Sequence, residues 1–252
     1  MDQYSVLAKY YDALMTDVDY GKWADFYSSC FDKSAVEIKN VCDIGCGTGS
    51  ITTIMAKRGF SMTGVDMSPE MLCLAQKKAD EEGVFIRFAE QDMSSLDIGI
   101  TADAVVCALD GINYLKDTSH IRSCFDRVND TLCDDGMFIF DINTPYKYKN
   151  VLGCNAFIYE LDDMFLSWQS FFNEKSGICD YVLTFFAEHG GVWHRHDEEQ
   201  WQRSYSIRTI RKLLKEAGFI IESEYSDVDR APLDECSERA FFVCRKESNG
   251  KI

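Results

Sequence analysis

Basic residues are scarce in this chain of 252 residues, and their scarcity limits the partners that the protein can bind. Lysine and arginine number 26 against 42 aspartates and glutamates, a formal net charge of −16 at pH 7. Such an excess of negative charge disfavours association with phosphate backbones and anionic lipid headgroups. The densest basic cluster lies on one predicted helix and indicates a solvated helix face; it consists of Arg208, Arg211, Lys212 and Lys215. We therefore expect neither a nucleic acid nor a membrane as the main partner.

Long apolar runs and paired cysteines are also missing. No apolar run is long enough to cross a bilayer. The eleven cysteines include no C-x-x-C pair, and most lie inside apolar runs such as residues 105–108. An odd number of cysteines, with no signal peptide before them, favours buried free thiols in a reducing compartment over disulfides or zinc ligands. We therefore expect a cytoplasmic protein.

Histidine is rare as well, with four in the chain. His194 and His196 fall two residues apart in a predicted strand, so their side chains share one face. Two histidines without a third ligand are weak evidence for a metal site, and we predict none. His194 is a candidate general base toward an amine or hydroxyl group, and a solvated strand edge is the alternative interpretation.

Three glycines, in contrast, lie close together in one turn between a predicted strand and a predicted helix. Residues 41–50 read V-C-D-I-G-C-G-T-G-S, so Gly45, Gly47 and Gly49 follow the end of a buried strand and precede an amphipathic helix. Such a turn lets the backbone approach a ligand closely. The spacing is neither the G-x-G-x-x-G of NAD-binding folds nor a P-loop. The adjacent acid, Asp43, suits a ligand that carries positive charge rather than a pyrophosphate.

The D-I-G-C-G-T-G segment resembles motif I of the class I S-adenosylmethionine (SAM)-dependent methyltransferases. The run Y-D-A-L-M-T-D-V-D-Y at residues 11–20, followed by Trp23, is similar to a narrower group of small bacterial methyltransferases whose substrate is unassigned. So are residues 197–199 and 203–205. The resemblance covers nearly the whole chain and implies that SAM is bound and S-adenosylhomocysteine is released.

The order of predicted elements supports an α/β fold. Helices are predicted over 3–16 and 20–31, followed by alternating strands and helices, then antiparallel strands over 156–204, a helix over 206–217 and two strands. Strands one to five are predicted over residues 36–44, 60–66, 84–89, 104–109 and 137–142. This order predicts a doubly wound, seven-stranded, Rossmann-like methyltransferase sheet. We predict a SAM-binding domain (1–145 and 205–246), a helical lid (1–33) and a β insertion that caps the acceptor (146–204).

The resemblance also implies roles for acids at the carboxyl ends of the strands. Asp66 would accept hydrogen bonds from the ribose hydroxyls, Asp92 from the adenine amino group, and Asp43 would hold the methionine ammonium. Met67 would pack on the adenine ring. Alternatives for these acids are helix capping, an ordinary loop position and a structural role. The remaining predicted cofactor residues are Gly45, Cys46, Gly47, Gly49, Met71, Gln91, Met93 and Leu109.

Two aromatic residues of the predicted lid complete the cofactor set. Tyr11 and Trp23 would exclude water from the reacting groups or face the SAM cation, and packing of the helices on the sheet is the equal alternative.

Residues 109–114 follow strand four, where the methyl group would be presented. Enzymes that methylate amines of DNA bases resemble one another in an N/D-P-P-Y/F motif at this place, and this chain has no proline there. Asn113 and Tyr114 are the candidates that would orient an acceptor, and a local turn is the alternative.

Together these features predict direct SN2 transfer of a methyl group from SAM to a small-molecule acceptor, an amine or a hydroxyl. Net acidity weakly favours a cationic or neutral acceptor. A tRNA or rRNA methyltransferase and a non-catalytic SAM-binding protein are the alternatives, and a nicotinamide oxidoreductase is disfavoured by the glycine spacing. We expect a monomer or a homodimer.

Overall fold

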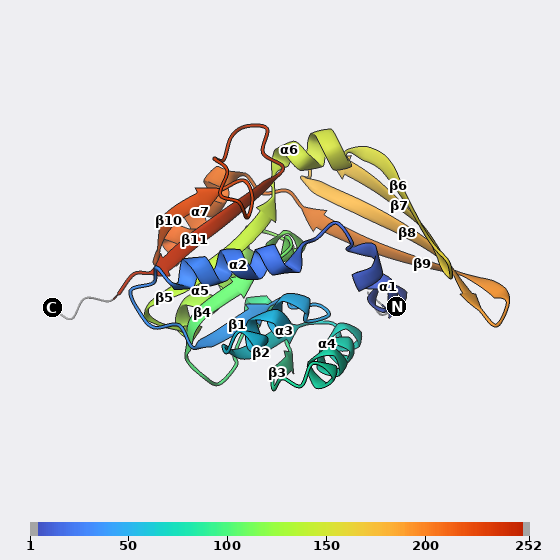
Figure 1. The fold of residues 1–252 in the computed structure, drawn as a ribbon. Coiled ribbons are helices and arrows are strands. Elements are labelled where there is room, and N and C mark those ends of the chain that lie inside the picture. Colours follow the sequence, from blue (N-terminus) through green and yellow to red (C-terminus); the bar gives the residue numbers. More distant parts are fainter. Residues whose placement is uncertain (1–4, 249–252) are drawn as a thin grey trace.

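The computed structural model describes residues 5–248 and contains two β-sheets (Figure 1). The chain passes from the larger sheet to the smaller one at the carboxyl end of an inner strand. The larger sheet has seven strands. In spatial order they are β10 (Phe219–Tyr225), β11 (Arg239–Lys246), β5 (Leu132–Asn143), β4 (Ala102–Cys107), β1 (Asn40–Ile44), β2 (Ser61–Asp66) and β3 (Arg87–Glu90). Strands β1 to β5 are parallel, whereas β11 runs antiparallel to both of its neighbours. This confirms the predicted doubly wound sheet.

Helices cover both faces of this sheet because its strands carry apolar side chains on both sides. One face packs on α2 (Tyr20–Phe31), α3 (Ser50–Lys57) and α4 (Pro69–Glu81), and the other on α5 (Thr118–Thr131) and α7 (Ile207–Glu216). Several cysteines lie fully buried in these layers, as expected of small apolar side chains; they include Cys42, Cys107, Cys124 and Cys244. No helix within residues 5–248 is both long and apolar enough to span a bilayer.

Local signals that were readable in the sequence position these helices. Ser68 caps α4 by accepting a hydrogen bond from the Met71 amide, and Pro69 takes the first helical position. Ser206 caps α7 through the Thr209 amide, and Gly218 follows the helix with φ +80°. Capping therefore fixes where both helices begin.

Several predicted strand boundaries differ from the structure; β4 (Ala102–Cys107), predicted over 104–109, begins and ends two residues earlier, and three strands differ more. β1 begins at Asn40 rather than residue 36, because only residues 40–44 pair with the neighbouring strands. β3 is shorter and later than predicted because it is an edge strand that pairs only with the end of β2. β5 begins at Leu132, because Leu132 pairs with Ala102 across a register shift that the apolar pattern does not reveal.

The predicted β insertion is a four-stranded antiparallel sheet made of consecutive strands. They are β6 (Cys154–Leu161), β7 (Met164–Asn173), β8 (Ile178–His189) and β9 (Val192–Arg203). The chain enters it from β5 through a short helix, α6 (Pro145–Lys147), and a π-helical turn at Tyr148–Leu152. Figure 1 shows this sheet projecting from the seven-stranded sheet, with α1 (Ser5–Leu14) beneath it.

Helix α1 packs on the inner face of the insertion rather than on the larger sheet. Tyr10 is buried against Met164, Leu166 and Phe185, and Leu7 and Leu14 contact the same cluster. The exposed side of α1 reaches α4 through an ion pair of 2.7 Å between Asp12 Oδ2 and Lys78 Nζ. Residues 3 and 4 of the predicted first helix lie outside the described residues. Helix α1 therefore connects the insertion to the larger sheet.

We expect Gly49→Ala to destabilise the protein more than Gly83→Ala, because the two glycines share a backbone conformation but differ in their surroundings. Their φ angles are +71° and +67°, so an added Cβ is strained at both, at a cost of about 1 kcal/mol. At Gly49 the new Cβ would also lie 2.9 Å from Ala75 Cβ, whereas at Gly83 it meets no atom within 4 Å. Urea unfolding should show about 1–3 kcal/mol of additional loss for Gly49→Ala. Equal losses would show that the contact between α3 and α4 accommodates a methyl group.

Candidate functional site

The glycine turn forms one wall of a cavity at the carboxyl ends of β1 and β2. Gly45 and Gly47 have φ angles of +70° and +53°, and the Gly45 and Cys46 amides donate to the Val65 carbonyl at 2.7 and 3.0 Å. A Cβ added to Gly47 would meet no atom within 4 Å, so this backbone faces open space. The turn is therefore shaped to let a ligand lie directly against the main chain.

Asp66 lies at the end of β2 and faces this turn. Its Oδ2 accepts a hydrogen bond from the Gly47 amide and its Oδ1 accepts one from the Ser68 amide, both at 2.9 Å. Burial raises the pKa of Asp66, and these amide donors partly oppose the rise. Each carboxylate oxygen has a further lone pair that can accept a hydrogen bond from a ligand.

Asp43 is the most deeply buried acid of the cavity, with 2% of its surface exposed. Its Oδ2 accepts a hydrogen bond of 2.5 Å from the Thr52 hydroxyl, and its Oδ1 has no hydrogen-bond partner among the described residues. Burial raises the pKa of Asp43 to about 7, and the negative charge of Asp66 adds to this effect. A cationic ligand group would satisfy the free oxygen and favour the ionised form.

Most of the predicted cofactor residues line this first cavity, together with Tyr114. Those that do are Tyr11, Asp43, Gly45, Cys46, Gly47, Asp66, Met67, Met71, Gln91, Met93 and Leu109. The prediction missed several other lining residues, among them Leu7, Tyr20, Thr48, Ser50, Ile51, Ala108 and Gly111. Tyr20 could have been found from its place in the Y-D-x-L-M-x-D-V-D-Y segment, whereas Leu7 enters only through the packing of α1.

The structure places three predicted cofactor residues away from this wall. Trp23 is buried in the core, where its ring packs on Phe241 at a centroid distance of 5.0 Å. Asp92 turns its carboxylate to the Ser94 amide at 2.7 Å and caps a 3₁₀ turn, Met93–Ser95. Gly49 begins α3 and lies against Ala75 of α4. Packing, which was the alternative for Trp23, describes its position; for Asp92 the alternative was an ordinary loop position, and the structure shows it capping a turn.

Two of the three predicted catalytic residues also lie elsewhere. Asn113 is fully buried; its Oδ1 accepts from the Asn143 amide at 2.9 Å, and its Nδ2 donates to the Arg203 carbonyl at 2.8 Å. It thus joins the end of β5 to the end of β9. His194 is exposed near the β8–β9 hairpin turn, beyond the cavity walls. No group of three metal-ligating side chains occurs in the described part of the chain.

A second cavity adjoins the first and is enclosed by α1, the inner face of the insertion and the ends of β4 and β5. The two cavities share four lining residues, Leu7, Tyr11, Leu109 and Tyr114. Most of the second wall is apolar or aromatic, including Phe157, Leu166, Trp168 and Leu183. The Tyr114 hydroxyl donates to Gln200 Oε1 at 3.4 Å, which connects the shared wall to β9.

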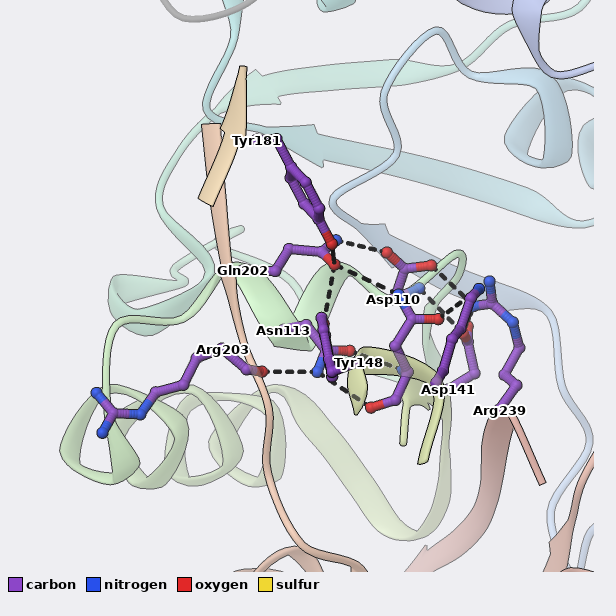
Figure 2. Close-up of polar contacts among 10 residues, drawn as sticks. Asp110, Asn113, Asp141, Tyr148, Tyr181, Gln202, Arg203 and Arg239 are labelled. Atoms are coloured by element: carbon purple, nitrogen blue, oxygen red, sulfur yellow. Dashed lines mark hydrogen bonds and ion pairs between the residues drawn. The ribbon is translucent and has the colours of Figure 1, made fainter. Parts of the chain in front are cut away.

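The floor of the second cavity is a buried polar network that sequence reasoning missed entirely (Figure 2). Asp110 lies at its centre: Oδ1 pairs with Arg239 Nη1 at 2.9 Å, and Oδ2 accepts from Gln202 Nε2 at 2.6 Å. Gln202 Oε1 in turn accepts hydrogen bonds from the Tyr148 and Tyr181 hydroxyls at 2.8 and 2.9 Å. The network therefore joins the end of β4 to the insertion.

Arg239 also binds a second carboxylate beneath the floor. Asp141 is fully buried, and its Oδ2 accepts from Arg239 Nη1 and from the Asp110 amide, the latter at 2.9 Å. Burial raises the pKa of Asp141 to about 6, with Arg239 opposing and Asp110 adding to the rise. The hydrogen bond from the Asp110 amide to Asp141 matters because Leu109 and Asp110 both have left-handed backbones, with φ of +56° and +58°. Two such residues in succession are strained and need neighbouring structure to hold them.

Comparisons with known proteins agree with this geometry. A family model described as a methyltransferase domain matches residues 41–136. A protein of Geobacillus sp. strain WCH70 that is named a methyltransferase is 35% identical over 246 residues, which cover 96% of this chain and 99% of that protein.

Solved structures show the same similarity. A crystal structure of a SAM-dependent methyltransferase from Clostridium acetobutylicum ATCC 824 is 32% identical, covers 95% of this chain and 96% of its own, and has a TM-score of 0.87. The sugar N-methyltransferase KedS8 from Streptoalloteichus sp. ATCC 53650 has a TM-score of 0.78 at 18% identity, covering 94% of this chain and 93% of its own, which shows the fold alone.

We expect Asp43→Asn to stabilise the protein at pH 8 and to have little effect below about pH 4. The folded-state pKa of about 7 lies above the usual 3.8, so the folded state binds this proton more tightly. The stability that protonation contributes is complete below pH 3.8 and is lost as the pH rises through 7. The uncharged amide of the variant avoids that loss, which we put at about 2 kcal/mol after allowing for relaxation. Urea unfolding across this pH range tests the expectation, with exposed Asp126→Asn as the control. A gain that does not change with pH would contradict it.

We expect Arg239→Met to cost about 3–5 kcal/mol in the free energy of unfolding, because it leaves the fully buried Asp141 and the partly buried Asp110 without a counter-ion. The loss should be smaller at pH 5, since burial raises the pKa of Asp141 to about 6 and its carboxyl can then take up a proton. Combining it with Asp141→Asn should recover part of the loss.

The matched control for this prediction is Arg245→Met on the same strand. Arg245 pairs with Asp135 and Glu222, whose side chains are 33% and 40% exposed, so we expect a loss of about 1 kcal/mol or less. Equal losses for the two variants would contradict a special role of the buried carboxylates.

Proposed function

Because the chain belongs to the class I SAM-dependent methyltransferases, we propose that it transfers the methyl group of SAM to a small-molecule acceptor bound in the second cavity. The observation that carries the proposal is the shared wall of the two cavities. Leu109 and Tyr114 line both of them at the carboxyl end of the central strand β4. Parallel α/β sheets bind their ligands at this edge.

The residues of the first cavity fit SAM. The unpartnered Oδ1 of Asp43 matches a ligand ammonium, the two oxygens of Asp66 can each accept one hydroxyl hydrogen bond, and the open backbone at Gly47 admits close contact. When bound, SAM supplies an activated methyl group on its sulfonium, which a nucleophile displaces in line. These fits support the cofactor roles proposed for Asp43, Asp66 and the glycine turn.

The walls of the second cavity would contribute proximity and exclusion of water. Helix α1 and the insertion enclose it, and Tyr11 of α1 lines both cavities. Holding two reactants in line and away from solvent accounts for a large part of the rate in such displacements. We therefore propose residues 146–204 as the acceptor cap. Of the predicted lid, residues 1–33, we propose only α1, because α2 packs on the core of the larger sheet.

Tyr114 is the side chain that we propose to orient the acceptor. It lies in the wall between the cavities, and its hydroxyl is already connected to Gln200 on β9. The methylated atom that we propose is an amine nitrogen or a hydroxyl oxygen. We no longer propose His194 or Asn113, since neither side chain lines either cavity.

A small molecule is favoured over RNA by the enclosure of the second cavity and by the formal net charge of −16. KedS8, by its name, methylates a sugar, and the shared fold is compatible with an acceptor of that size.

The experiment that tests the proposal is a calorimetric titration of the purified protein with SAM, S-adenosylhomocysteine and NADH. We expect the first two to bind and NADH not to bind. Asp66→Ala should weaken SAM binding by about 30-fold or more, because both ribose hydroxyls would lose their acceptors. Exposed Asp80→Ala on α4 is the matched control and should bind SAM normally.

The result is interpretable only if the variants fold, so their thermal midpoints are measured alongside. A folded native protein that does not bind SAM would overturn the proposed function. Binding without methyl transfer to any member of an amine and hydroxyl acceptor panel would favour a non-catalytic SAM-binding protein instead.

A further inference from the structure

Two side chains that line the second cavity carry buried hydrogen-bond donors that have no acceptor among the described residues. Trp168 Nε1 and Gln200 Nε2 are buried atoms without a partner among the described residues. Both side chains line the second cavity, and Gln200 is 5% exposed. Buried donors without acceptors cost free energy, so a pair of them in one cavity indicates a ligand that supplies oxygen atoms.

A third donor, Lys147, lines the same cavity and carries charge. Its Nζ donates to Asn143 Oδ1 at 2.9 Å, and no carboxylate in the described chain lies within ion-pairing distance of it. An ammonium has three hydrogens, so one neutral partner leaves it under-satisfied. Burial lowers the pKa of Lys147, and the nearby Arg239 charge lowers it further. An anionic ligand group would relieve both effects.

The cavity offers no matching excess of acceptors. The carboxylate that lines the cavity, Asp110, accepts from Arg239 and Gln202, and its charge is paired with that of Arg239. Asp110, Glu238 and Asp141 act on Lys147 only through longer-range attraction, and of these three carboxylates Asp110 lines the cavity. The unsatisfied polar atoms of this cavity are therefore donors, which is the reverse of what a cationic acceptor requires.

The remaining wall is built for an apolar body. Phe157 lies against Trp168 with ring centroids 5.2 Å apart, and Tyr181 meets the other side of Trp168 at 5.4 Å. Leu152, Leu166 and Leu183 complete this part of the wall. A ligand bound here would bury an apolar body against these side chains at one end and place oxygen atoms near the donors at the other.

We propose that the second cavity binds an apolar carboxylic acid, with Lys147 pairing with the carboxylate and Trp168 and Gln200 donating to oxygen atoms of the same molecule. An amine or hydroxyl elsewhere on this acid would form the new C–N or C–O bond as the S–CH3 bond of SAM breaks; S-adenosylhomocysteine would leave, and the acceptor's proton would pass to water. This inference rests on the proposed function for the identity of the cavity, and it names the class of acceptor.

The test uses matched sets of probes titrated calorimetrically into the full chain saturated with S-adenosylhomocysteine. One set is 3-phenylpropionate, its amide and 3-phenylpropylamine; the others are built on indole-3-propionate and octanoate. We expect at least one acid to bind about ten-fold or more tightly than its own amide, and the amines to bind more weakly still. An amine or amide that binds as tightly as the acid in each set, or no acid binding at all, would overturn the inference.

Variants then show which residues produce the preference for the acid over its amide. Lys147→Met should remove the preference of about ten-fold for acid over amide and leave S-adenosylhomocysteine binding unchanged. Lys149→Met is the matched control, because Lys149 follows two residues later and forms an exposed ion pair with Glu174 at 3.2 Å. Trp168→Phe keeps an aromatic ring but removes the donor, and should weaken acid binding about three- to ten-fold.

The two proposals fail in different ways. A folded native protein that does not bind S-adenosylhomocysteine would overturn the proposed function. Normal S-adenosylhomocysteine binding with no acid preference, or a Lys147→Met variant that keeps the preference, would overturn only this inference. If Lys147→Met does not fold, Trp168→Phe and the probe sets still decide the result.

Discussion

The guanidinium of Arg239, whose side chain is 21% exposed, is the group on which the geometry of the candidate site depends. It lies at the start of the last strand, β11, and binds the Asp141 carboxylate of β5 and the Asp110 carboxylate after β4. Asp110 then accepts from Gln202 of β9, so four segments distant in sequence meet around one cation. Buried ion pairs contribute little net stability, because desolvation offsets their attraction. Their consequence is specificity: the floor of the second cavity forms only when all four segments are in register.

The same cluster explains why a strained turn persists where the two cavities meet. Leu109 and Asp110 both adopt left-handed backbones, a conformation that neither side chain favours. Asp141 holds the turn by accepting from the Asp110 amide, and Arg239 favours its ionised form by opposing the effect of burial on its pKa. The turn places Leu109 in the shared wall and Asp110 in the floor of the second cavity. Strain in the backbone is thus offset by a charge cluster beneath it.

The parts that could be predicted from the sequence are those encoded over short distances. The glycine turn, the Asp66 position and the Ser68 and Ser206 caps each depend on residues close together in the chain, and the structure contains all of them. The polar network could not be predicted, because Asp110, Gln202 and Arg239 approach only through the order of the strands. His194 illustrates the same limit. Strand periodicity gives the face on which a side chain lies but not its distance along the strand from the cavity.

Trp23 and Asn113 show a related ambiguity, because aromatic and amide side chains serve packing and ligand binding equally well. What separates the two uses is whether the polar atoms are satisfied. Both polar groups of Asn113 have protein partners, so nothing remains for a ligand. Trp168 and Gln200 have the opposite character, with donors that no described residue accepts.

Net charge and local charge give opposite indications about the acceptor. The formal charge of −16 weakly favours a cationic or neutral acceptor. That charge describes the whole surface, where it governs solubility and long-range attraction. Recognition in an enclosed cavity instead depends on the few polar groups within it, because water there is replaced by the ligand. In the second cavity those groups are the under-satisfied ammonium of Lys147 and two neutral donors, while the carboxylate that lines it, Asp110, is paired with Arg239. The polar groups of the second cavity therefore matter more for the charge of the acceptor than the net charge of the protein does. An acidic protein can thus have a site selective for an acid.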